Sequence, residues 1–68
     1  MKTTFSKDEF EKIKELLKKK EDAISSYEQK KIRAQLRRNG YYISDFDGAN
    51  TVRELQDLVH NGIIKVVG

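Results

Sequence analysis

The 68-residue chain contains no cysteine, no proline and no tryptophan, and it has a single histidine. Without cysteine it can form neither a disulfide nor a thiolate metal site, and one histidine excludes a histidine-rich zinc site. The lack of cysteine suits a reducing compartment, so we expect a cytoplasmic protein. No apolar run approaches the roughly 20 residues of a membrane span, and the first residues lack the apolar segment of a signal peptide. We therefore expect no membrane association, no metal and no cofactor.

Charge is abundant, but its sign changes along the chain. Residues 1–40 contain twelve Lys and Arg against seven Asp and Glu, whereas residues 41–68 contain two against four. A basic half of this kind raises the expectation of a polyanionic partner. The alternative, for a net charge of only +3, is an ordinary charged and soluble surface. The length predicts one domain, residues 1–68, near the lower limit at which a hydrophobic core suffices.

The strongest local signals mark a central helix that follows Ser25 or Ser26. Each of these serines precedes a Glu or Gln by three residues, which is the spacing of a capping box. Asn39-Gly40 indicates the helix end, because glycine readily adopts the left-handed conformation found there. In such an ending Tyr41 contacts Leu36.

This central helix has one apolar face and one basic face. At about 100° per residue, Ile32 and Leu36 lie together on one side. An arc of roughly 160° on the opposite side holds only positive charge, and Glu28 is the one acid near enough to offset any of it, through Lys31. The cations of this arc, which we call the basic face, are Lys30, Lys31, Arg33, Arg37 and Arg38.

Two more helices flank the central one in the sequence. Ser6 and Glu9 form a capping box that predicts a helix from Lys7, ending between residues 18 and 22. Lysines 18–20 could clamp a phosphate, although lysines at a helix C-terminus also complement its dipole, and we favour the dipole. Thr51 and Glu54 form a third capping box, which predicts a helix from Val52 that ends at residues 61–62.

The remaining segments predict two strands. In residues 41–46 the side chains at 41, 43 and 45 alternate with those at 42, 44 and 46, and the segment is rich in aromatic and β-branched residues. Both features are typical of an extended strand. Residues 63–67 form a β-prone apolar run that we expect to pair with them, in a sense that stays open. The predicted fold class is α+β, mostly helical, a small single domain of order α-α-β-α-β with a two-strand sheet.

Candidate catalytic and metal sites are weak. Asp47-Gly48 followed by Glu54 has the spacing of the second half of an EF-hand loop, but Ile43 then falls on the first ligand position. Asp45 and Asp47 suit turn formation better than a glycosidase pair in so short a chain. His60 is the sole histidine, and no nucleophile and base accompany it in a recognisable motif. We expect no enzyme, no catalytic residue and no metal ligand.

The leading hypothesis is a small nucleic-acid-binding or regulatory domain in which the basic face makes mainly phosphate contacts. The tyrosines at 27, 41 and 42 lie near these cations and could stack on bases, although we expect burial to leave only one of them free. The phenylalanines at 5, 10 and 46 are predicted core residues. The alternative is a protein-interaction module or small inhibitor that docks the basic helix on an acidic partner surface. Homo-oligomerisation is also open, because a two-strand sheet leaves an exposed edge.

Overall fold

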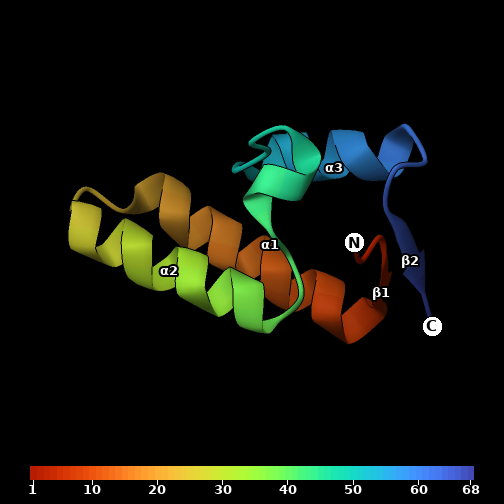
Figure 1. Ribbon diagram of the computed structural model, residues 1–68, viewed down its shortest axis with the longest axis horizontal. Helices are drawn as coiled ribbons and strands as arrows, with labels where there is room; N and C mark the ends of the chain where they lie inside the picture. Colours follow the sequence, from red (N-terminus) through yellow and green to blue (C-terminus); the bar gives the residue numbers. More distant parts are fainter.

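The computed structural model describes residues 1–68 and contains three α-helices, one 3₁₀ turn and two short strands (Figure 1). In chain order these are β1 (Thr4–Ser6), α1 (Lys7–Asp22), α2 (Ser26–Arg38), η1 (Ile43–Phe46), α3 (Val52–His60) and β2 (Lys65–Val67). The predicted fold class, mostly helical α+β with a two-stranded sheet, is confirmed. The predicted order is wrong, because the first strand precedes α1 instead of following α2.

The helices enclose one hydrophobic core. Figure 1 shows α1 and α2 side by side and running in opposite directions, with α3 packed on the far side of α1 from α2. The segment between α2 and α3 crosses the front of this arrangement and contains η1. The buried core residues come from every α-helix and from both ends of the chain: Phe5, Ile13, Leu16, Leu17, Ile32, Leu36, Tyr41, Phe46, Ala49, Leu55 and Ile64. Phe10 is only partly buried against them.

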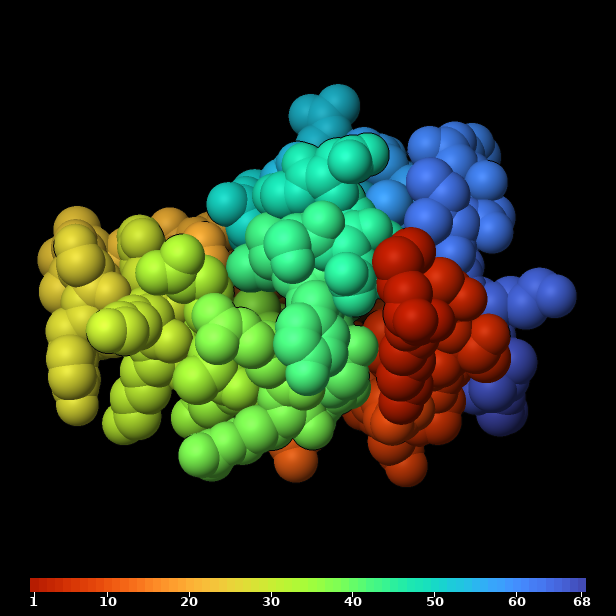
Figure 2. Space-filling view, viewed as in Figure 1, coloured from red at the N-terminus to blue at the C-terminus, as the bar shows by residue number.

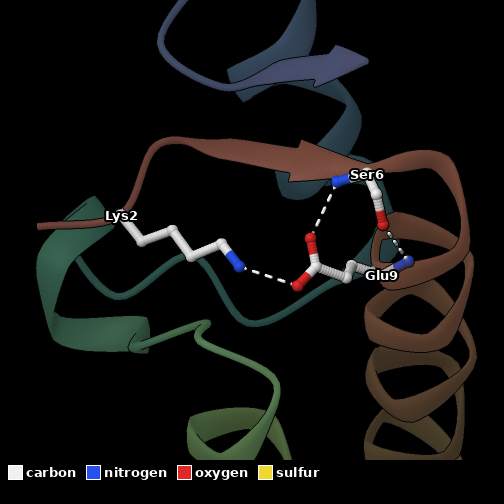
Figure 3. A network of polar contacts seen from close by, with 3 residues as sticks. All are labelled: Lys2, Ser6 and Glu9. Atoms are coloured by element: carbon white, nitrogen blue, oxygen red, sulfur yellow. Dashed lines mark hydrogen bonds and ion pairs between the residues drawn. The ribbon is translucent and has the colours of Figure 1, made fainter. Parts of the chain in front are cut away.

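All three helices begin at the residues that the capping patterns predict. The hydroxyl of Ser6 accepts a hydrogen bond from the Glu9 backbone N–H, and the Glu9 carboxylate accepts one from the Ser6 N–H, which completes the capping box (Figure 3). At α2 and α3 the hydroxyls of Ser25 and Thr51 accept hydrogen bonds from the backbone N–H groups of Glu28 and Glu54. Each cap satisfies a backbone donor that the helix leaves unpaired, so a local pattern determines the boundary.

Helices α2 and α3 also end as predicted, at glycines with positive φ. Gly40 has φ 85° and Gly62 has φ 75°. After α2 the Tyr41 N–H donates to the Leu36 carbonyl at 3.0 Å, and after α3 the Ile63 N–H donates to the Leu58 carbonyl at 2.9 Å. These six-to-one hydrogen bonds define a Schellman ending, in which glycine reaches the required φ without the strain that a Cβ causes.

Residues 41–46 do not form the predicted strand. The Tyr41 ring is fully buried, and its hydroxyl donates to the Ala49 carbonyl at 2.9 Å. The Phe46 ring stacks on Tyr41, with centroids 5.2 Å apart. Burying both rings in one place requires the chain between them to fold back, so residues 43–46 form the 3₁₀ turn η1. Asp47, with φ 55°, ends that turn.

The partner of β2 is instead the segment before α1. Strands β1 and β2 pair in parallel, with Phe5 opposite Val66. Strand β2 covers only residues 65–67, because the N–H groups of Ile63 and Ile64 both donate to the Leu58 carbonyl at the end of α3. Parallel strands require a long crossover connection, and helices α1, α2 and α3 between the two strands supply it.

Candidate nucleic-acid interface

All five cations of the basic face are exposed in the structure. Helix α1 carries as many acidic as basic residues, whereas α2 carries these five cations and a single acid, Glu28. The one ion pair of the structure joins Lys2 to Glu9 at 2.7 Å, so no carboxylate forms an ion pair with the basic face, and the expected Glu28–Lys31 pair does not form. The positive charge of α2 is therefore directed to solvent.

The five cations divide into two rows on α2. Lys30, Arg33 and Arg37 are spaced by three and four residues, which places them on one flank of a helix. Arg33 and Arg37 line a pocket of about 320 Å³ together with residues of the segment that follows α2. Figure 2 shows α2 and this segment, green to cyan, adjoining on one face of the molecule. The pocket is lined by Arg33, Arg37, Tyr41, Tyr42, Ile43, Ser44 and Gly48. No carboxylate lines it.

The second row, Lys31 and Arg38, faces helix α1. Lys31 lines a pocket of about 390 Å³ that also contains Lys19, Asp22 and Glu28. Arg38 lines a neighbouring pocket with Lys12, Lys19 and Glu15. Acidic and basic groups are mixed in both hollows, so the two rows differ in their electrostatic surroundings. Of the lysine run 18–20, only Lys19 borders α2.

The structure adds residues that the helix pattern alone did not identify. Tyr42 and Ser44 line the arginine pocket because η1 folds them back toward α2. Lys12 and Lys19 extend the second row, and their seven-residue spacing on an amphipathic helix was a signal that could have revealed them.

Of the tyrosines, Tyr41 is buried and cannot stack on a base, whereas Tyr27 and Tyr42 are 76% and 46% exposed. Two tyrosines are thus free, one more than expected.

The wall of the arginine pocket is held by core contacts. The Asp45 N–H donates to the Tyr42 carbonyl at 2.9 Å, and the Gly48 N–H donates to the Ile43 carbonyl at 3.0 Å. Beneath them Tyr41 is fixed by its stacking on Phe46 and its hydrogen bond to Ala49. Burial raises the pKa of Tyr41 to about 12, with a smaller contribution from the negative charge of Glu54, so its hydroxyl remains a donor at neutral pH. The backbone on this side of the pocket is therefore anchored to the core.

The residues considered as catalytic or metal-binding candidates are not part of the three pockets along α2. His60 is exposed in the last turn of α3 and lines none of the three pockets along α2. Asp45 and Asp47 are exposed, and no three His, Asp or Glu side chains are grouped so that they could hold a metal ion. None of the helices combines the length and the apolar character that crossing a membrane requires.

Comparison of the chain with protein-family models, with curated proteins and with solved structures found no match. A functional conclusion must therefore come from the chemistry of this surface.

Proposed function

We propose that the protein is a small nucleic-acid-binding domain that contacts phosphates through the basic face of α2. The observation that carries this proposal is that five exposed cations lie on one helix, with one acid beside them and no ion pair among them. Phosphate contact requires only positive charge and reach, and it supplies most of the affinity in non-specific nucleic-acid binding.

The arrangement favours backbone contact over base reading. Arginine presents a planar fork of N–H donors that matches two phosphate oxygens, and the row of Lys30, Arg33 and Arg37 extends along more than one helical turn. The charge-balanced α1 beside α2 limits the basic surface to this helix and its edges. We accordingly expect weak sequence preference and strong dependence on salt concentration.

The test replaces Arg33, Arg37 and Arg38 together by Gln and measures binding to unrelated nucleic acids over a range of salt. Each lost phosphate contact removes about 0.9 from the slope of log affinity against log salt on B-form DNA, so the slope should decrease by roughly 2 to 3. Affinity should decrease alike for all sequences. Folding should be nearly unchanged, because all three side chains are exposed.

A matched control removes the same charge elsewhere. Lys7, Lys18 and Lys65 are exposed and line none of the three pockets along α2. Their combined replacement by Gln should change the salt slope far less than the arginine triple variant does. If the parent binds no nucleic acid more tightly than about 10⁻⁴ M at physiological salt, the weak limit of non-specific binding, the proposal is wrong.

A second candidate function is docking on an acidic protein, and the corner between α1 and α2 favours it. Ile24 in that corner is 100% exposed and Tyr27 is 76% exposed, beside the first lysines of the basic face. Exposed apolar residues with a charged rim are typical of protein interfaces. Saturable binding of one acidic protein that is lost in Ile24→Ser, with nucleic-acid affinity absent, would favour this function over the first.

A further inference from the structure

The arginine pocket differs from the other two hollows along α2 in its chemistry. Two guanidinium groups, one helical turn apart, lie with Tyr42 and Ser44 in a space of about 320 Å³. Both neighbouring pockets contain carboxylates, and this one contains none. An anion should therefore bind more favourably in this pocket than in the other two, because no negative charge in its lining repels it.

The second element of this pocket is an aromatic residue, Tyr42. Tyr42 is 46% exposed, and the residues on both sides of it are anchored: Tyr41 is fully buried and Ile43 is partly buried against the core. A ring on an anchored backbone loses little conformational freedom when another ring stacks on it. Stacking on aromatic side chains is the usual means by which proteins hold unpaired bases of any sequence.

We propose that this pocket is a subsite for one unpaired nucleotide, whose phosphate lies between Arg33 and Arg37 and whose base stacks on Tyr42. The inference rests on the proposed nucleic-acid function and makes it more specific, because a base within a duplex is stacked on its neighbours and cannot lie on the tyrosine. The volume is at the small end of ligand pockets, which fits a single nucleotide. The preferred ligand is therefore single-stranded DNA or RNA.

The experiment compares labelled oligo(dT) and oligo(U) with a duplex of equal length, using the full chain and three variants. Tyr42→Ala should weaken binding of the single strands by about 5- to 150-fold, the usual loss for one stacked base, and leave duplex binding nearly unchanged. Tyr42→Phe keeps the ring and should retain affinity. Tyr27→Ala is the matched control, because Tyr27 is more exposed but lies outside the pocket. The relative affinity of the parent for oligo(dT) and oligo(U) shows whether DNA or RNA is preferred.

A second measurement distinguishes loss of stacking from loss of folding. Stacking quenches tyrosine fluorescence, and the chain has no tryptophan to obscure it. Oligo(dT) should therefore quench the parent and Tyr27→Ala but not Tyr42→Ala, whose thermal melt should match the parent. If single strands and duplex bind equally and Tyr42→Ala changes neither, the subsite is refuted while the proposed function stands. If no nucleic acid binds, both are refuted.

Discussion

Tyr41 connects the end of α2 to the wall of the arginine pocket. Its backbone N–H completes the Schellman ending, its ring stacks on Phe46, and its hydroxyl donates to the Ala49 carbonyl. These three interactions fix the direction in which the chain leaves α2. The positions of Tyr42 and Ser44 in the pocket therefore depend on a neighbouring residue that is itself fully buried.

Because the pKa of Tyr41 is raised, part of the folding stability should be lost at alkaline pH. A folded-state pKa of about 12, against 10.0 for the free side chain, means that folding favours the neutral phenol. This contribution is fully present below pH 10 and is lost as the pH rises toward 12. Tyr41→Phe should cost about 1 to 3 kcal/mol at neutral pH, because the Ala49 carbonyl loses its donor. Urea unfolding between pH 8 and 11 should show the difference between parent and variant shrinking. A constant difference would contradict this account.

The two helix-ending glycines allow a cleaner test of backbone strain. A Cβ on Gly62 would meet nothing within 4 Å, so Gly62→Ala tests the cost of φ 75° alone, about 1 to 2 kcal/mol. A Cβ on Gly40 would lie 2.9 Å from the Lys2 side chain, so Gly40→Ala should cost somewhat more. Gly62→Asn should be milder than Gly62→Ala, because asparagine tolerates this conformation. Equal thermal melts for all three variants and the parent would contradict the prediction that a side chain is strained at these two positions.

At the scale of elements, the sequence predicted what local chemistry determines. Each helix start depends on a hydroxyl and backbone groups within four residues, and each glycine ending on a similarly short stretch, so their patterns can be read directly. The strand pairing depends on contacts between Thr4–Ser6 and Lys65–Val67 across the whole chain, which no local pattern encodes. The alternation in residues 41–46 was misleading because the burial of Tyr41 and Phe46 together overrides β-propensity.

The candidate site likewise has one part that the sequence predicted and one part that it did not. Helical periodicity predicted that the five cations oppose Ile32 and Leu36, and their exposure is confirmed. The pocket was not predictable from that periodicity, because Tyr42 and Ser44 join Arg33 and Arg37 only once η1 turns the chain back. A strand over the same residues would have placed these side chains elsewhere.

The junction of β1 and α1 is organised around Glu9. Its carboxylate accepts hydrogen bonds from the Lys2 ammonium at 2.7 Å and from the Ser6 N–H at 2.8 Å, and Lys2 also lies 5.0 Å above the Phe5 ring (Figure 3). The hydrogen bond from Lys2, followed by that from Ser6, lowers the pKa of Glu9 below its usual 4.5. One acid thus ties the N-terminal segment to the first helical turn.

Glu9 should therefore contribute to acid sensitivity. A lowered folded-state pKa stabilises the protein above pH 4.5, and this contribution is lost as the pH falls through the folded-state value. Glu9→Gln keeps an oxygen acceptor but has no charge to titrate, so its stability should depend less on pH in the acidic range. Lys2→Met should raise the pKa of Glu9 part of the way, which a carboxyl NMR titration would measure. An unchanged pKa in Lys2→Met would contradict the assigned cause.

At the scale of the whole molecule, the parallel ladder joins the two ends of the chain. Figure 1 shows β1 and β2 side by side beneath α3, with Phe5 and Ile64, each 1% exposed, contributing core from either end. The residues between them include every helix and the whole basic face. The ladder therefore closes the fold around its core, although it is only three residues long.

If the ladder closes a single cooperative unit, breaking it should weaken the whole domain. Lys65→Pro removes the N–H that donates to the Thr3 carbonyl at 2.9 Å and should cost about 1 to 3 kcal/mol. Lys65→Ala keeps that N–H, and because Lys65 is exposed it should stay within about 0.5 kcal/mol of the parent. Hydrogen exchange distinguishes global from local loss: the slowest amides of α1, α2 and α3 should lose protection by the same factor in Lys65→Pro. If only the strand amides exchange faster, the helices form the cooperative unit alone and the ladder is an attachment to it.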